Sequence, residues 1–133
     1  MKPNLRIYTA SCLHHAPLWR QLAHEWSEFT FSARWPFHHC DSNGTPIWPE
    51  SFAPIFWEQD VEDIKNSDVL LIWAEPNDPL RGALVEAGVA LGLGKKIILS
   101  GQNERFGTWQ FHPLISSVKS LEEGRKLLNL LAI

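Results

Sequence analysis

Apolar runs of strand length alternate along this chain with longer segments whose apolar residues recur at helical spacing. The first kind predicts strands over residues 5–11, 30–35, 68–75 and 95–101, and a short one near Val118. The second kind predicts helices over residues 17–29, 56–67, 79–93 and 121–132. This alternation predicts a single-domain, flavodoxin-like (Rossmann-like) α/β fold: a parallel sheet of about five strands with helices on both faces.

Residues 36–55 form the longest stretch without a predicted element. Four of the nine prolines lie there, together with an Asn-Gly pair. A simple connection does not need this length, and long structured loops in small domains often carry function. The loop is therefore a candidate functional segment.

The ends of the predicted strands are the first places to look for a site. In open parallel sheets, ligands bind at the carboxyl ends of the strands, in the crevice where the strand order reverses. The residues that follow strands in this chain are Tyr8 to Ser11, Arg34 and Trp35, Glu75 to Asp78, and Gly101 to Asn103. Side chains for binding are expected among them.

Glu86 is the one polar residue in an otherwise apolar segment between Arg81 and Lys95. It shares a helical face with Gly82 and Ala90, and residues this small allow a close approach to the sheet or to another helix. We expect the Glu86 carboxylate to point into a tight, dry space near the strand ends. The alternative is a surface glutamate that favours the positive end of the helix dipole.

Length and charge limit the partners of the chain. Its 133 residues suit one domain, and a formal charge of −3 with no basic run argues against binding to a nucleic-acid polymer. No apolar run is long enough to span a bilayer, and the start of the chain does not read as a signal peptide. We expect a cytoplasmic protein that does not bind membranes.

The cysteines and histidines show no familiar metal-ligand spacing. Cys12 and Cys40 lie far apart, which suits two free thiols in a reducing compartment. The segments "CLHH" (12–15) and "FHHCD" (37–41) contain adjacent histidines, which point in opposite directions on an extended chain. We therefore predict no metal site.

The motifs of a known family occur here in three segments, in order: "IYTAS" (7–11), "DVEDIKNSDVLLI" (60–72) and "GALVEAGVALGLGKKIIL" (82–99). Together they resemble the nucleoside 2-deoxyribosyltransferase-like family, which includes nucleotide N-glycosidases. The resemblance implies an enzyme that cleaves or exchanges the N-glycosidic bond of a small-molecule nucleoside or nucleotide. A glutamate would attack the anomeric carbon and form a glycosyl-enzyme intermediate. No cofactor is implied.

The resemblance also assigns residues. Glu86 matches the nucleophile, and Asp60 matches an acid that hydrogen-bonds and protonates the departing base, which requires a raised pKa while Glu86 stays ionised. Tyr8 matches a tyrosine that positions the nucleophile or the sugar, and Glu75 could bind ribose hydroxyls. Asp60 could equally be an exposed helix acid, and Tyr8 a core residue.

The chain departs from the family pattern at two places. Leu80 and Arg81 replace the aspartate that transferases carry before the motif glycine, Gly82, although Asp78 could reach the same space. The Gly- and Arg-rich turn of phosphate-binding relatives is replaced by "ASCLHHAP" (10–17), where Ser11 and the histidines could still hold an anion. The base, the sugar, the need for phosphate and the acceptor therefore stay open.

Aromatic residues in and beside the long loop suggest a surface on which a base could stack. They are Trp35, Phe37, Trp48, Phe52 and Trp57. They could equally anchor the loop. A competing interpretation of the chain is a non-catalytic module that binds a nucleotide, a nucleoside or a partner protein, in which case a bound ligand would persist unchanged.

The helix over 79–93 is apolar on every side, whereas one sheet covers only one of its faces. We therefore expect a homodimer, or a larger even-numbered oligomer, through this helix or through the first one.

Overall fold

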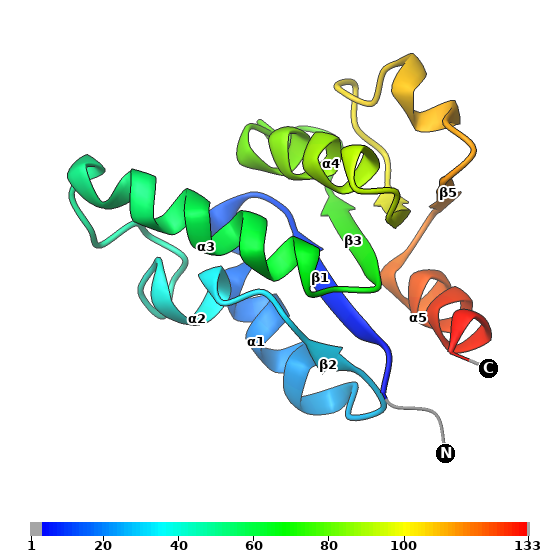
Figure 1. The fold of residues 1–133 in the computed structure, drawn as a ribbon, viewed down its shortest axis with the longest axis horizontal. Coiled ribbons are helices and arrows are strands. Elements are labelled where there is room, and N and C mark those ends of the chain that lie inside the picture. The colour runs from blue at the N-terminus through cyan, green and yellow to red at the C-terminus, as the bar shows by residue number, and fades with distance from the viewer. Residues whose placement is uncertain (1–3, 133) are drawn as a thin grey trace.

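The computed structural model describes residues 4–132, which form a single five-stranded parallel sheet (Figure 1). Its strands lie in the order β2-β1-β3-β4-β5. Their bounds are β1 Arg6–Ala10, β2 Thr30–Phe31, β3 Val69–Ala74, β4 Lys96–Gly101 and β5 Ile115–Val118. This is the doubly wound order of flavodoxin-like folds, and it confirms the predicted fold class.

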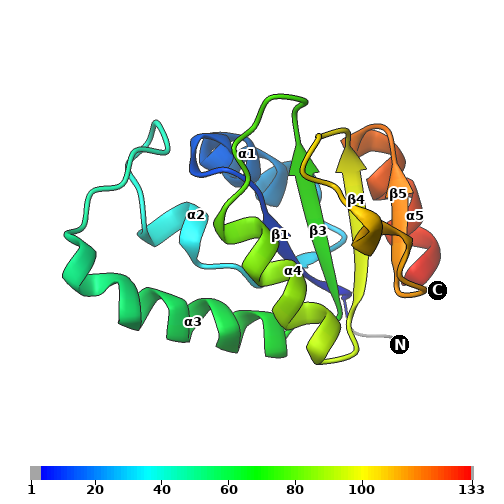
Figure 2. The same ribbon diagram turned by 90° about the horizontal axis from the view of Figure 1, so that it is seen from above.

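Helices cover both faces of the sheet, as predicted. They are α1 Ala16–Glu25, α2 Trp35–His38, α3 Ala53–Lys65, α4 Gly82–Gly92 and α5 Leu121–Leu131. Three 3-10 turns complete the structure: η1 Leu13–His15, η2 Glu50–Phe52 and η3 Thr108–Phe111. Helices α1 and α5 lie on one face, and α3 and α4 lie beside each other on the opposite one (Figures 1 and 2).

The core lies along the central strands. Leu70, Leu71 and Ile72 of β3 are completely buried, which explains why β3 is a continuous apolar run rather than an alternating one. Trp19 of α1 and Ile64 of α3 are also completely buried. Each such side chain stabilises the fold by roughly 1.5–3 kcal/mol through burial.

Four predicted boundaries were wrong by three residues or more. Helix α1 ends at Glu25 rather than at residue 29, because Trp26, with a ψ of 63°, leaves the helical conformation. Helix α4 begins at Gly82 rather than at residue 79, because the Asp78 side chain accepts a hydrogen bond from the Glu75 N–H instead of capping a helix. Helix α3 begins at Ala53, inside the predicted loop. The second strand is only two residues long, and Trp35 opens a helical turn rather than ending a strand.

The long loop is held against the turn that follows β1. Gly44 has a φ of 80°, and a Cβ atom at this position would collide with the backbone of Leu13 and His14. A residue without a side chain therefore lets the loop approach η1 closely. This contact brings two segments that are distant in sequence to the same edge of the sheet.

The helices between residues 4 and 132 are all too short or too polar to cross a membrane.

Candidate active site

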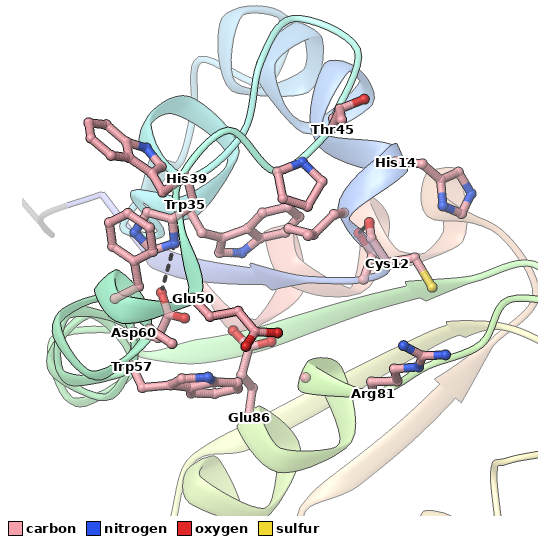
Figure 3. Close-up of a pocket in the computed structure, with 18 of the residues that line it drawn as sticks. Cys12, His14, Trp35, His39, Thr45, Glu50, Trp57, Asp60, Arg81 and Glu86 are labelled. Carbon is pink, nitrogen blue, oxygen red and sulfur yellow. Dashed lines mark hydrogen bonds and ion pairs between the residues drawn. The ribbon is translucent and has the colours of Figure 1, made fainter.

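A cavity of about 670 Å³ lies at the carboxyl ends of β1 and β3, where the strand order reverses. Its walls come from the turn after β1, from α2, from the loop over residues 43–50, from α3 and from the start of α4. In Figure 3, Asp60, Trp57 and Glu86 gather on one side of it, and Arg81, Cys12 and His14 on the other. This is the crevice that the fold predicts for a ligand.

Glu86 lies at the inner end of the cavity. Helix α4 carries it there, and only 5% of the residue is exposed. Tyr8, completely buried in β1, donates a hydrogen bond from its hydroxyl to Glu86 Oε2. Gly82 lies one turn earlier on the same face of α4, and a Cβ atom there would be 3.8 Å from Glu86 Oε1. The carboxyl group is thus oriented by one donor in a confined space.

Asp60 of α3 is the second acid of the cavity. It is buried, and its Oδ1 atom has no hydrogen-bond partner among residues 4–132. The His39 Nδ1 atom lies 3.9 Å from Oδ1, and Figure 3 marks this contact. The expectation that Asp60 could be an exposed helix acid is therefore wrong.

Burial raises the pKa of both acids. It raises the pKa of Asp60 to about 7, and the charge of Asp63 adds to this, while the Tyr8 hydroxyl and Arg34 act in the opposite direction. Burial also raises the pKa of Glu86 well above its usual range, the charge of Asp60 adds to the effect, and the Tyr8 hydrogen bond opposes it. The sequence analysis expected a raised pKa for Asp60 alone. Burial therefore favours the protonated form of both acids, and the charge of Asp60 couples the titration of Glu86 to its own.

Tyr8 stays protonated under the same conditions. Burial, followed by the charges of Glu86 and Asp60, raises the pKa of its hydroxyl well above the usual value. The hydroxyl can therefore act as a hydrogen-bond donor to whichever carboxylate is ionised.

Aromatic rings form one wall of the cavity. His39 stacks on Phe56 at a centroid distance of 3.8 Å, and Trp48 packs at 5.0 Å against Phe52, which itself lies outside the lining. The Trp57 ring lies 3.4 Å from the point where a Cβ atom of Gly82 would be. These rings offer an apolar surface of the kind on which a planar base stacks.

Five of the nine predicted site residues line the cavity: Ser11, Trp35, Asp60, Gly82 and Glu86. Tyr8 lies beneath it, in contact with Glu86. The Ser11 hydroxyl accepts a hydrogen bond from the Trp19 indole at 2.7 Å, and the Trp35 indole donates to the Thr9 carbonyl at 2.7 Å. The polar atoms of these two residues are therefore already engaged.

Arg34, Glu75 and Asp78 lie outside the lining of the cavity. Arg34 forms an ion pair with the buried Asp63, with Nη2 2.8 Å from Oδ1. Glu75 is exposed. Their predicted contacts with substrate stay predictions, and the observed contacts of Arg34 are structural.

Asp78 is held by the segment that follows β1. Its Oδ2 atom lies 2.8 Å from His15 Nε2 and accepts the Glu75 N–H at 2.9 Å, and His14 Nε2 lies 3.5 Å from Oδ1. Burial alone would raise the pKa of Asp78, but the Glu75 N–H and the His15 ring lower it below the usual value. Asp78 thus connects the loops after β1 and β3.

His14 and His15 do not point in opposite directions, so that prediction was wrong. His14 and His15 lie in a 3-10 turn, not in an extended segment, and both approach Asp78. Among residues 4–132, two groups bring three ligand atoms within 4.8 Å of one another: Cys12, His14 and Asp78, and His15, Glu75 and Asp78. The absence of a metal site stays a prediction.

Sequence reasoning missed His39, Glu50 and Arg81 as residues of the cavity. Arg81 directly precedes Gly82 in the family-like motif, so its position was a usable signal. His39 and Glu50 belong to the long loop and its flanks, which the prolines did mark as a functional segment. No spacing in the sequence pairs His39 with a residue of α3.

The fold and the cavity define a single α/β domain with a buried acidic site at its topological switch point. No known family profile matches the sequence, and no curated protein matches it. Among solved structures, the CMP N-glycosidase BcmB of Clostridium botulinum is similar, with a TM-score of 0.58 and 19% sequence identity. The match covers 95% of this chain and 98% of that chain. The chain therefore shares the fold of that protein over nearly its whole length, while membership of a family stays a prediction.

Proposed function

We propose that this protein cleaves the N-glycosidic bond of a nucleoside or nucleotide, with Glu86 as the nucleophile. The observation that carries the proposal is the buried Glu86 carboxyl group, which receives a hydrogen bond from Tyr8 and shares a cavity with the buried acid Asp60. The N-glycosidase-like fold supports it. Most enzymes that cleave glycosidic bonds use two carboxyl groups in one site.

In the reactive form, Glu86 is ionised and Asp60 carries the proton of the pair. A Glu86 oxygen forms a bond with the anomeric carbon while the bond from that carbon to the base nitrogen breaks. Asp60 gives its proton to the base and is left as a carboxylate. The positive charge that develops on the sugar favours the ionised form of Glu86, which burial alone disfavours.

The second half of the reaction releases the sugar. Asp60, now ionised, accepts a proton from water as the water oxygen attacks the anomeric carbon, and the ester bond to Glu86 breaks. If a second base attacks instead, the same intermediate gives transfer rather than hydrolysis. Tyr8 donates to Glu86 whenever Glu86 is a carboxylate, so it stabilises both the attacking and the departing anion.

The two sides of the cavity suit two parts of a substrate. The aromatic wall with Phe56 and Trp57 would receive the base. On the other side, Arg81 and His14 could hold an anionic group, which leaves both nucleosides and nucleotides as substrates.

The test is to incubate the protein with a panel of nucleosides, nucleoside monophosphates and NAD, with and without a second base, and to follow free base by chromatography. Glu86→Gln, which keeps the volume of the side chain, is the matched control. Base release by the wild type alone supports the proposal, and the substrate that reacts identifies the sugar and the phosphate requirement. Equal release by both proteins would exclude Glu86 as the nucleophile.

One observation favours a second candidate, a module that binds a nucleotide or nucleoside without cleaving it. Burial keeps the pKa of Glu86 high, and a neutral carboxyl group is a hydrogen-bond donor rather than a nucleophile. In this case the ligands of the panel bind, as calorimetry would show, and are recovered unchanged from the wild type.

We also propose that two copies associate through α4. Its outer face exposes Val85, at 55%, together with Gly88 and Gly92, so an apolar surface is left uncovered by the sheet. Light scattering at micromolar concentration should give the mass of a dimer for the wild type and a smaller mass for Val85→Glu. A wild-type monomer would contradict the proposal.

A further inference from the structure

We propose that His39 is a positioning residue for Asp60, and that its Nδ1 atom holds Asp60 Oδ1 so that the other oxygen, Oδ2, faces the departing base. This inference rests on the proposed function. It adds a residue that neither the sequence motifs nor the fold assigns, and it concerns the acid rather than the nucleophile.

The first support is the unmatched oxygen of Asp60. Its Oδ1 atom is buried and has no hydrogen-bond partner among residues 4–132, which is costly for a carboxyl group. His39 Nδ1, at 3.9 Å, is a ring nitrogen that faces this atom (Figure 3). A small movement of either side chain would complete the bond, and catalytic hydrogen bonds are often long before the substrate binds.

The second support is the way in which the His39 ring is fixed. It stacks on Phe56 with an interplanar angle of 17°, and its Nε2 atom lies 3.3 Å from Gln59 Oε1. Phe56, Gln59 and Asp60 lie three and four residues apart on α3, so one turn of the helix presents a stacking surface, an amide and a carboxyl group to the same ring. The ring is thus oriented by α3 itself.

The charge state of the ring fits this role. Burial lowers the pKa of His39, and His38 and Arg34 act in the same direction, while Gln59 and Asp63 oppose it. The neutral ring has one N–H, which Nδ1 can direct at Asp60 while Nε2 accepts from the Gln59 amide once that amide is turned over. The other titratable groups that act on Asp60 are Tyr8, Glu86, Asp63 and Arg34.

The contact has a direct chemical consequence. When Asp60 Oδ2 transfers its proton to the base nitrogen, Asp60 becomes a carboxylate, and the His39 N–H stabilises that anion without itself losing a proton. Without the N–H, Asp60 holds its proton more tightly and rotates more freely. The alkaline limb of the pH profile, which reports loss of the Asp60 proton, should then move to higher pH, and kcat should fall.

The test compares His39→Phe with His39→Gln. Phenylalanine keeps the stack on Phe56 and removes the donor, whereas glutamine can restore an N–H near the position of Nδ1. We expect kcat to fall about 10- to 100-fold in His39→Phe with little change in KM, and the alkaline limb to move up by about one pH unit. His39→Gln should recover most of both. His38→Phe, at the exposed neighbouring position, is the matched control and should keep the wild-type profile.

A wild-type pH profile in His39→Phe would show that the ring serves only as a wall, and the proposal would be wrong. A second measurement does not depend on turnover. The ring proton signals of His39 in nuclear magnetic resonance should show a titration step near the pKa of Asp60, and this step should disappear in Asp60→Asn. If base is never released but the step is present, the proposed function fails while the contact holds. If the step is the same in both proteins, the contact itself is refuted.

Discussion

Four acidic side chains are buried between residues 4 and 132, and they fall into two pairs with opposite surroundings. Asp78 and Asp63 have partners: His15 and a backbone N–H surround the first, and Arg34 forms an ion pair with the second. Asp60 and Glu86 are as deeply buried, yet no cation pairs with either within hydrogen-bond distance in residues 4–132, and only Tyr8 donates to Glu86. The comparison shows that burial is common to all four acids, and that the lack of a cationic partner within hydrogen-bond distance is what distinguishes Asp60 and Glu86 from the other two.

The largest expected effect is the difference in kcat between a substitution of Glu86 and a substitution of Asp78. Glu86→Gln should lower kcat by about a thousandfold or more, because the amide of glutamine cannot form the ester bond to the sugar. Asp78→Asn should stay within about tenfold of the wild type per folded molecule, since Asp78 lies outside the cavity lining. Steady-state base release at matched folded concentrations measures both. If Asp78→Asn lowered kcat as much as Glu86→Gln does, the distinction drawn between the two pairs of acids would be wrong.

The second prediction sets Asp60 against Asp63. Asp60→Asn should lower kcat/KM by about 10²- to 10⁴-fold and remove the alkaline limb, because an amide neither donates a proton as an acid nor titrates. Asp63→Asn should keep the limb but move it to lower pH, since the charge of Asp63 is one cause of the raised pKa of Asp60. Profiles of kcat/KM between about pH 5 and 9 distinguish these outcomes.

The third prediction concerns Tyr8. Tyr8→Phe removes the one hydrogen bond to Glu86 and keeps the ring in the core. A hydrogen bond to a charged group contributes about 1.5–3 kcal/mol, so kcat should fall roughly 10- to 100-fold. An unchanged kcat would mean that the hydroxyl only fills space beneath the cavity. Thermal unfolding of the variant checks that the core is intact.

The smallest expected effects are on stability. Glu86→Gln and Asp78→Asn should change the stability of the fold in opposite directions. Folding raises the pKa of Glu86, so above the pKa of the unfolded chain the burial of this acid works against folding. Glu86→Gln should therefore unfold at a higher temperature than the wild type at pH 8, and this gain should shrink at pH 5. Folding lowers the pKa of Asp78, so its contribution is present at pH 8 and is lost as the pH falls through that lowered value.

Asp78→Asn should accordingly be less stable at pH 8, by about 1–3 kcal/mol, and should approach the wild type in acid. Differential scanning calorimetry of both variants at several pH values measures the two trends. If the unfolding temperatures of both variants shift in the same direction at pH 8, the partners of Asp78 do not explain why its effect on stability differs from that of Glu86.

The strands and the buried position of Glu86 were predictable because both depend on local pattern. The apolar run of β3 identified a central strand, and a single glutamate in an apolar helix identified Glu86. The start of α4 was not predictable. Aspartate is a residue type that often caps helices, but the Asp78 side chain instead contacts His15, which lies 63 residues earlier in the sequence. The contact of His39 with Asp60 likewise depends on how the long loop folds back on α3. Long-range contacts of loops therefore lie beyond what spacing alone can show.

The close contact between Trp57 and Gly82 gives the protein an optical property of its own. Indole carbons of Trp57 lie 3.4 and 3.5 Å from the point where a Cβ atom of Gly82 would be, and Glu86 Oε1 lies 3.8 Å from that same point. A molecule that binds beside Glu86 should therefore change the surroundings of Trp57, a residue that is 37% exposed. The emission of Trp57 should change on occupancy, and the difference from Trp57→Phe isolates its share. Intrinsic fluorescence thus provides a label-free gauge of binding, even for a compound that is never cleaved.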